Sequence, residues 1–295
     1  MIDRLLLGDN PFNSVDHLSQ ERARKRPGLT TEEIAGVVQA AFESGASGFV
    51  FSNRPKNLLV LSHLKAIGSP REMKLYPVVP DVQEISQQVS TEGTLALLRS
   101  MLSQMNLTSK AKLVFRGGLG AMTRDPIRLL RAYLAAEVSA VRKAAPSDAT
   151  LVTLMLHELF TDLIVALRLE DFLEEYVGFV RDGVKTRPGF VTRNFSQFTE
   201  FARQTRIELD DTVVMTPLNA MGYQMNPNRD ACEESLKHSE GLNVIGMSVL
   251  SAGFLTPGKA IEYLNSLPKR VSCVVGVSTV EHAHQTFAEF KRRLE

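Results

Sequence analysis

Short apolar runs alternate with longer helical segments along the whole chain, and this alternation constrains the fold more than any other feature. Each run is only a few residues long and is followed by a turn signal and then by a segment with helical periodicity. The runs are apolar throughout, as expected for parallel strands covered on both faces. The predicted strands are Leu5–Leu7, Gly48–Ser52, Leu75–Val79, Leu113–Arg116, Leu151–His157, Phe190–Arg193, Val213–Leu218, Val244–Ser248 and Val271–Val275.

The segments between these runs are predicted to be helices. One of them opens with Thr30-Thr-Glu-Glu, in which a capping threonine precedes a glutamate by three residues. The predicted helices are Thr30–Glu43, Lys56–Ile67, Thr91–Met105, Pro126–Lys143, Asp162–Arg181, Ser196–Arg206, Asp230–Ser239, Pro257–Leu267 and Val280–Leu294.

The predicted fold class is α/β, a (β/α)8 TIM barrel in which parallel strands alternate with helices. Uninterrupted strand–helix units over 295 residues favour a barrel over an open, doubly wound sheet. About nine strands are predicted, which is one more than a barrel of this type needs. Either Leu5–Leu7 or Leu113–Arg116 therefore lies outside the barrel, or one of the assignments is wrong.

The chain is predicted to form a single domain over residues 1–295, because no linker, low-complexity tract or change of composition interrupts it. Phe12–Gly28 follows the first predicted strand and carries the polar run Gln20-Glu-Arg-Ala-Arg-Lys-Arg. Loops of this length in compact domains are usually functional or disordered. We interpret Phe12–Gly28 as a lid that covers one end of the barrel.

Composition and charge exclude several classes of partner. A formal net charge of +1 gives no electrostatic case for a nucleic acid or an acidic partner. No apolar run approaches the roughly 20 residues of a membrane span, and the first residues lack the pattern of a signal peptide.

The cysteines Cys232 and Cys273 are expected to be reduced, structural thiols. We predict a cytoplasmic protein that acts on a small molecule, and the sequence leaves its oligomeric state open.

The stretch from Asn243 to Thr286 contains two successive strand–turn–helix units. In the second, Gly276 allows a sharp turn after an apolar run, and Ser278 and Thr279 can cap the following helix. The first N–H groups of that helix and the positive end of its dipole then face the region above the strand, which is the description of an anion site, most often for phosphate. The alternative is an ordinary strand–turn–helix unit without a ligand.

Active sites of such barrels lie where strands end and the following loops begin. His157 is the most informative residue there, because it follows the apolar run Leu151–Leu156 directly. It could be a general acid, a hydrogen-bond donor to a carbonyl oxygen, a metal ligand, or a structural histidine bonded to a neighbouring loop. The other strand-end candidates are Asp9, Asn10, Ser52, Asn53, Arg54, Asp81, Arg116, Glu158, Arg193, Asn194, Asn219, Ser248, Ser251, Ser278 and Thr279.

Arg116 and Arg193 end two predicted strands, and buried guanidinium groups need partners. They hold either an anionic ligand or a carboxylate of the protein, such as Glu158 or Asp81. No metal is expected, because cysteine-rich spacing does not occur in the sequence and the His-x-His pair His282 and His284 lies within a predicted helix. No lysine ends a predicted strand, which argues against Schiff-base chemistry.

The order of motifs resembles the aldo/keto reductase superfamily. Ser248-Val-Leu-Ser-Ala-Gly-Phe-Leu is similar to that family's Ser-Pro-Leu-x-x-Gly-x-Leu after strand seven, and Leu154-Met-Leu-His is similar to its strand-four histidine motif. The other motifs that carry the likeness are Leu5–Phe12, Ala40–Phe49, Pro188–Ser196, Ala260–Leu264 and Val274–Thr279. The resemblance implies a barrel fold and the binding of a nicotinamide nucleotide, NAD(P). The nucleotide would contact Asn194, Asn219, Ser248, Ser251, Gly253, Leu255, Gly276, Ser278 and Thr279.

The catalytic set departs from the family. That set is an Asp at the end of strand two, a Tyr in the following loop, a Lys on strand three and the strand-four His. Here the Asp position falls on Val50 or Phe51, no tyrosine occurs between residues 52 and 74, and Pro80 stands where the Lys is expected. Only His157 carries over. The basic residues that hold a 2′-phosphate after strand eight are absent from Thr279–Thr286.

Three functional hypotheses follow. The first is an aldo/keto reductase-like oxidoreductase with a degenerate catalytic set, in which His157 polarises a small carbonyl or hydroxyl compound, assisted by Arg116 and Arg193. The second is a barrel lyase, isomerase or hydrolase that binds an anionic phosphate or carboxylate substrate through Arg116, Arg193 and the helix terminus at Ser278. The third is a non-catalytic, ligand-binding descendant. Unpaired arginines facing the cavity would favour the second hypothesis, an enzyme that binds an anionic substrate.

Overall fold

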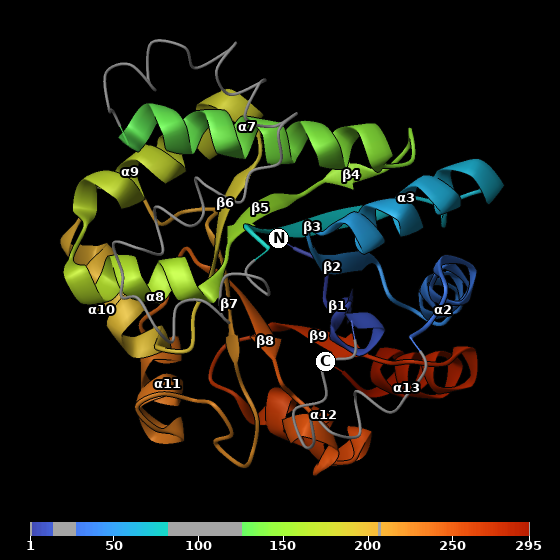
Figure 1. Ribbon diagram of the computed structural model, residues 1–295. Coiled ribbons are helices and arrows are strands. Elements are labelled where there is room, and N and C mark those ends of the chain that lie inside the picture. The colour runs from blue at the N-terminus through green and yellow to red at the C-terminus, as the bar shows by residue number, and fades with distance from the viewer. Residues whose placement is uncertain (1, 14–27, 82–125, 206–207, 295) are drawn as a thin grey trace.

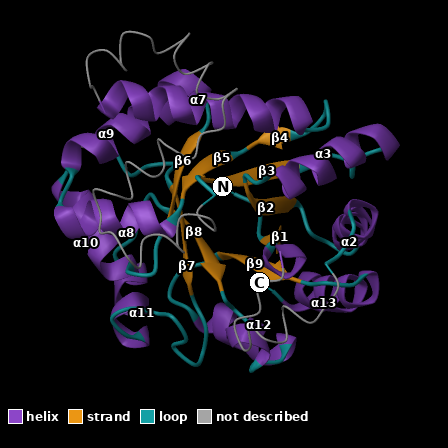
Figure 2. Ribbon diagram, in the orientation of Figure 1, coloured by secondary structure: helices purple, strands orange, loops and turns teal. Residues whose placement is uncertain are grey.

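The computed structural model describes residues 2–13, 28–81, 126–205 and 208–294. At its centre, parallel strands form a sheet that closes on itself, with helices around it (Figure 1, Figure 2). The strands are β1 (Leu5–Gly8), β2 (Gly48–Ser52), β3 (Lys74–Val79), β4 (Thr150–Leu151), β5 (Thr153–Leu156), β6 (Arg187–Val191), β7 (Val213–Pro217), β8 (Asn243–Met247) and β9 (Ser272–Gly276).

The ring closes because β1 pairs with both β2 and β9, while β2 also pairs with β3. The short strand β4 and strand β5 both pair with β3 and are separated by Val152 alone, so they are two parts of one barrel strand. The nine strands of the sheet therefore make eight barrel positions. This confirms the predicted (β/α)8 barrel.

The closure also resolves the surplus strand of the sequence prediction. Leu5–Leu7 belongs to β1, which is hydrogen-bonded on both sides, so the alternative that placed it outside the barrel is wrong. Leu113–Arg116 and the predicted helix Thr91–Met105 lie outside the described residues. All eight positions of the ring are filled without Leu113–Arg116.

Helices cover the outer surface of the ring. They are α2 (Thr31–Glu43), α3 (Pro55–Ile67), α7 (Pro126–Ala144), α8 (Glu158–Leu167), α9 (Glu170–Gly178), α10 (Phe195–Gln204), α11 (Arg229–Lys237), α12 (Pro257–Ser266) and α13 (Val280–Arg293), with shorter helical turns η1 (Asn10–Asn13), η2 (Phe179–Val184) and η3 (Ser251–Gly253). Helix α2 begins with the predicted capping box: Thr30 accepts a hydrogen bond from the Glu33 N–H, and Glu33 accepts one from the Thr30 N–H.

The predicted helix Asp162–Arg181 is wrong in its start and in its continuity. Helix α8 begins at Glu158, because His157 caps it, and ends where Arg168 takes a left-handed backbone conformation with φ of 52°. A second helix, α9, then starts at Glu170. The apolar periodicity of the segment is helical on both sides of the break, so the pattern alone does not reveal it.

Two apolar clusters follow from the alternation of side chains along each strand. On β1, Leu6 points into the ring, whereas Leu5 and Leu7 pack under the helices. The inner cluster consists of Leu6, Val50, Tyr76, Val78, Val152, Met155, Val191, Val213, Met215 and Ile245. The interior of the barrel is therefore a packed core rather than a channel.

The segment predicted to be a lid starts inside the core. Phe12 is 1% exposed and packs on Phe49, with ring centroids 6.3 Å apart. Residues 14–27 of the predicted lid lie outside the described residues. Across the described part of the chain, the membrane-span criteria of length and apolarity are met by none of the helices.

We expect the inner cluster to tolerate no added carbon at Gly48. A Cβ there would lie 2.5 Å from Tyr76 Cε2 and 2.6 Å from Leu6 Cδ2, so Gly48→Ala should destabilise the fold by about 1–3 kcal/mol. Gly178→Ala is the matched control, since its Cβ would meet nothing within 4 Å and its φ is −59°. This variant should be unchanged or more stable by about 0.5–1 kcal/mol. Urea unfolding measures both, and equal stability of the two variants would contradict the tight inner packing.

Candidate functional site

The strand ends gather polar side chains at one face of the barrel. Because the strands are parallel, the residues that follow each of them lie at the same end of the ring. His157 follows β5, Arg193 follows β6 and Ser278 follows β9. The residues placed at this face are Asp9, Asn53, Arg54, Asp81, His157, Glu158, Arg193, Asn194, Asn219, Ser248 and Ser278. Arg116 lies outside the described residues.

His157 is held in one orientation and one tautomer. Its backbone N–H donates to the Val79 carbonyl at 2.8 Å, which continues the strand pairing to this residue. Its ring Nδ1 accepts the N–H of Leu159 at 3.2 Å and so caps α8. Burial lowers the pKa of His157, although the nearby carboxylates of Glu158 and Asp81 oppose this effect. The ring is therefore neutral near pH 7, with its proton on Nε2.

Arg193 is compensated by a carboxylate of the protein. Its Nη2 lies 2.5 Å from Glu158 Oε1, in the first turn of α8. The Arg193 backbone N–H donates to Asp162 Oδ2 at 3.3 Å, and the Thr192 hydroxyl donates to Asp162 Oδ1 at 2.5 Å. Of the two predicted partners of Arg193, an anionic ligand or a protein carboxylate, the structure shows the carboxylate. The Arg193 Nε is buried and lacks a hydrogen-bond partner among the described residues.

A second ion pair spans the next two strand ends. Arg54, after β2, donates from Nη2 to Asp81 Oδ1 at 3.0 Å, after β3. Asp9, after β1, is buried and accepts from the Ser52 N–H at 2.9 Å and from the Asn57 carboxamide at 2.6 Å. Burial raises the pKa of Asp9, while the hydrogen bond from Ser52 and the charge of Arg54 act in the opposite direction. The rim charges thus occur largely in matched pairs.

Glu137 is a site residue that the sequence analysis missed, because it lies inside the predicted helix Pro126–Lys143 and not at the end of a predicted strand. The Asn53 carboxamide donates to Glu137 Oε2 at 2.5 Å, and the Tyr133 phenol, one turn earlier, hydrogen-bonds to the same carboxyl group. Burial raises the pKa of Glu137 to about 7, with the charge of Asp81 adding to the effect. A glutamate in the middle of the otherwise Ala- and Leu-rich segment 127–141 is the only sequence signal for it.

Two of the predicted cofactor contacts, Asn194 and Thr279, precede the first residues of helices. The Asn194 side chain makes no capping hydrogen bond at the start of α10, although its N–H donates to Thr192 Oγ1 at 3.0 Å. Thr279 caps α13 by accepting the His282 N–H at 3.1 Å, as the sequence predicted. Before the turn, a Cβ on Gly276 would lie 2.8 Å from Pro11, so a larger residue does not fit there.

The loop after β8 has an unusual backbone. Ser248, Ser251, Ala252 and Gly253 all have positive φ angles, of 54°, 46°, 58° and 92°. The N–H groups of Ser251, Gly253 and Leu255 are used inside this turn, on the carbonyls of Ser248 and Leu250. The Ser251 hydroxyl is fully buried and has no hydrogen-bond partner among the described residues. Any ligand of this loop would therefore meet side chains rather than these three N–H groups.

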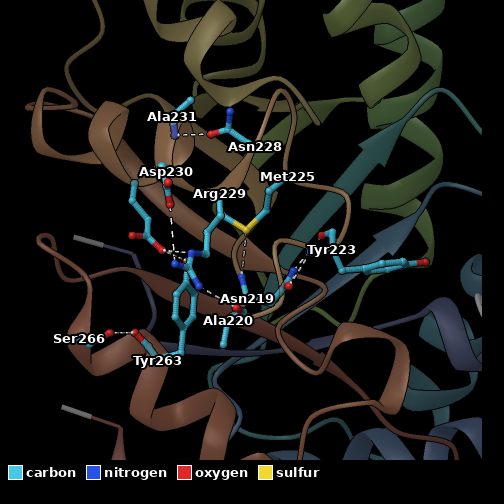
Figure 3. A network of polar contacts seen from close by, with 11 residues as sticks. Asn219, Ala220, Tyr223, Met225, Asn228, Arg229, Asp230, Ala231, Tyr263 and Ser266 are labelled. Carbon is cyan, nitrogen blue, oxygen red and sulfur yellow. Dashed lines mark hydrogen bonds and ion pairs between the residues drawn. The ribbon is translucent and has the colours of Figure 1, made fainter.

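Asn219 is used by the protein itself. Its carboxamide donates to the Tyr223 carbonyl at 2.9 Å and accepts the Tyr223 N–H at 2.8 Å, while its own N–H points at Met225 Sδ at 3.4 Å (Figure 3). The same loop is held by Arg229, which donates to the Ala220 carbonyl at 3.0 Å. The structure thus shows a loop-bracing role for Asn219, and its predicted cofactor contact stays a prediction.

Metal ligation finds no support in the described part of the chain, which contains no group of three or more His, Cys, Asp or Glu residues that could hold an ion. The arrangement offers one neutral hydrogen-bond donor, His157 Nε2, between two compensated ion pairs. Such a donor can polarise a carbonyl oxygen.

Comparisons with known proteins support the fold. No protein-family model matches the sequence. No curated protein sequence matches it either. A Pseudomonas aeruginosa protein described as an aldo-keto reductase is 13% identical with a TM-score of 0.58, over 100% of this chain and 92% of that one. An aldo-keto reductase from a Medee basin deep-sea metagenome is 12% identical with a TM-score of 0.53, over 100% of this chain and 87% of that one.

A third solved structure, an aldo/keto reductase from Brucella melitensis, is 9% identical with a TM-score of 0.53, over 90% of this chain and 86% of that one. Identities this low show a shared fold and nothing finer. The chain has the barrel fold of the aldo-keto reductases, as its motifs indicated.

We expect Glu137 to make stability fall with rising pH. Because its folded pKa, about 7, lies above the ordinary value of 4.5, the folded state prefers the protonated acid. The resulting penalty is absent below pH 4.5 and complete above about pH 7. Glu137→Gln removes it and should be more stable than the parent at about pH 8, by on the order of 3 kcal/mol, but not at about pH 4.

Urea unfolding at both pH values tests this expectation. Glu200→Gln is the control, since Glu200 is exposed on α10 and should show no such pH dependence. A gain that is the same at both pH values would mean that the carboxyl of Glu137 is not held protonated.

Proposed function

We propose that this chain is an aldo/keto reductase-like oxidoreductase with a rebuilt catalytic set, acting on a small carbonyl or hydroxyl compound. The observation that carries the proposal is the fixed tautomer of His157. Its Nδ1 is occupied by the Leu159 N–H, which leaves Nε2–H as the donor toward a substrate oxygen. A neutral imidazole is suited to stabilise negative charge that develops on that oxygen.

The ion pairs at the rim take the place of the family's missing charges. The family resemblance implies an acid after strand two and a lysine on strand three, whereas this chain has Arg54 after β2 and Asp81 after β3. The signs are exchanged, yet the pair still joins the same two strand ends. We propose that Arg54 and Asp81 orient the site through their mutual contact, and that none of the described residues repeats the usual Tyr–Lys proton donor.

The compensated arginine argues against an anion-binding lyase, isomerase or hydrolase. An anionic substrate needs a guanidinium with free charge, whereas Arg193 already contacts Glu158 at 2.5 Å. Arg193 therefore has a positioning role in this proposal: it holds the first turn of α8 and with it the cap at His157. A non-catalytic descendant is the remaining alternative, and it predicts no turnover at all.

The residues present fit a nicotinamide nucleotide, NAD(P), in part. When bound, that cofactor would supply or accept a hydride at the substrate carbon. The Asn194 carboxamide makes no capping bond, and the buried Ser251 hydroxyl has no hydrogen-bond partner in the part of the chain that the structure describes. Both are polar groups able to hold the cofactor. The first turn of α13 adds backbone N–H groups for a pyrophosphate, and these need no basic side chain. Asn219 is left out of this set because its carboxamide is satisfied within its loop.

Substitution of His157 separates catalysis from folding. Asparagine is a good N-cap, so His157→Asn should keep α8 capped while it removes the Nε2–H donor. His157→Ala should lose both functions and about 1 kcal/mol of stability. We expect both variants to lower kcat about 100-fold or more on a panel of small aldehydes and ketones with NADH.

Steady-state rates and urea unfolding on the same preparations provide the test. A kcat of His157→Asn within about three-fold of the parent value would refute the assigned donor, since loss of such a donor lowers kcat by about 100-fold or more. Absence of turnover in the parent with either nucleotide would favour the non-catalytic descendant.

NADPH should have no advantage over NADH. A 2′-phosphate needs charge-assisted donors, each worth about 1.5–3 kcal/mol, but the first turn of α13 carries Glu281 and neither Lys nor Arg. Dissociation constants for the two nucleotides, measured by fluorescence at one salt concentration, provide the comparison. A preference for NADPH of about ten-fold or more would show that a basic residue reaches the phosphate from elsewhere in the chain.

A further inference from the structure

A cavity lies at the opposite end of the barrel from His157. It has a volume of about 590 Å³ and is formed where strands begin rather than where they end. Its size falls in the range of small-molecule sites, roughly 300–1,000 Å³. The residues that line it are Asp3, Lys74, Thr150, Leu151, Val152, Arg181, Lys185, Thr186, Arg187, Pro188 and Asp211.

The charges of this lining do not cancel. Lys74 Nζ lies 2.6 Å from Asp3 Oδ1, and Arg187 Nε lies 2.5 Å from Asp211 Oδ1, so these four groups compensate one another. The two remaining cations, Arg181 and Lys185, form no ion pair with any of the described residues. The cavity therefore carries a surplus of two positive charges, in a chain whose formal net charge is +1.

Arg181 has neutral partners only. Its Nη2 donates to the backbone carbonyls of Glu208 at 2.5 Å and Asp210 at 3.0 Å. These bonds fix the guanidinium in place against the turn before β7, but they leave its charge uncompensated. A cation that is positioned in advance loses little conformational freedom when it binds an anion.

The wall that carries Lys185 is also fixed. The hydroxyl of the adjacent Thr186 donates to the Leu151 carbonyl at 2.9 Å, and Thr153 Oγ1 donates to the Arg187 carbonyl at 2.9 Å. The segment 185–187 is thereby tied to the strand formed by β4 and β5. Lys185 itself is exposed, at the end of η2. Its ammonium group is available to a ligand without any rearrangement of the backbone.

We infer that this cavity binds a compact anion with at least two negative charges, such as a molecule bearing phosphate or several carboxylate groups, through Arg181 and Lys185. Nearby cations concentrate such a ligand, and the attraction weakens as salt is added. The site is at the other end of the barrel from the rim that holds His157. The inference of an anion site is therefore independent of the proposed oxidoreductase function.

Isothermal titration of the intact chain with inorganic pyrophosphate and, separately, with citrate tests the inference at low ionic strength. We expect saturable binding of at least one probe. Binding of pyrophosphate alone would assign a phosphate ligand, and binding of citrate alone would assign a polycarboxylate. Failure of both to give saturable binding would overturn the proposal.

Charge-reversal variants locate the site. Lys185→Glu should weaken the bound probe about ten-fold or more, because an attraction becomes a repulsion at close range. Lys259 is exposed on α12, outside the cavity lining, and Lys259→Glu makes the same change in net charge. This variant should leave the affinity within about two-fold. Equal weakening by both variants would mean nonspecific attraction and would refute the site. His157→Asn should bind the probe as the parent does.

Discussion

The closed hydrogen-bonded ring is the constraint on which the rest of the structure depends. Strand β1 supplies it, since one of its edges pairs with β2 from Leu6 to Gly8 and the other pairs with β9 from Leu5 to Gly8. Closure satisfies both edges of every barrel strand and fixes all strand ends at two rims. Polar residues that are far apart in the sequence, such as Asp9 and His157, are brought to one rim for this reason alone.

The fold could be predicted from the sequence because its signals are local and repeated. Apolar runs, glycine turns and the Thr30 capping box each report the structure of their own segment. The prediction failed where the deciding contact was not local. The break between α8 and α9 at Arg168 leaves the apolar periodicity intact, and Leu5–Leu7 could be placed in the ring only once both of its neighbours were known.

The candidate site was predictable in its location but not in its electrostatics. His157 stands at a strand end, which the sequence shows, yet its tautomer depends on the N–H of Leu159, which only the folded chain shows. Arg193 offered two partners in the sequence, and the structure selects Glu158. Glu137 lies inside a helix and not at the end of a strand. Its contact with Asn53, 84 residues away, could therefore not be derived from spacing.

The cap at the start of α8 depends on the protonation state of His157, because both involve the same ring atom, Nδ1. Nδ1 can accept the Leu159 N–H only while it carries no proton. Acidification that protonates the ring would therefore turn an attractive contact into two opposed N–H groups, and would loosen the first turn of α8 while the ring becomes cationic. Two requirements limit which residues can replace His157. A replacement must accept the Leu159 N–H at the start of α8, and it must also donate a hydrogen bond to the reacting oxygen. Among the residues suited to cap a helix, none of the short polar ones also presents a donor at the distance of Nε2. A lineage that gave up the chemistry could keep the helix with Asn or Ser here, so the identity of this one residue would distinguish active from inactive descendants of the same barrel.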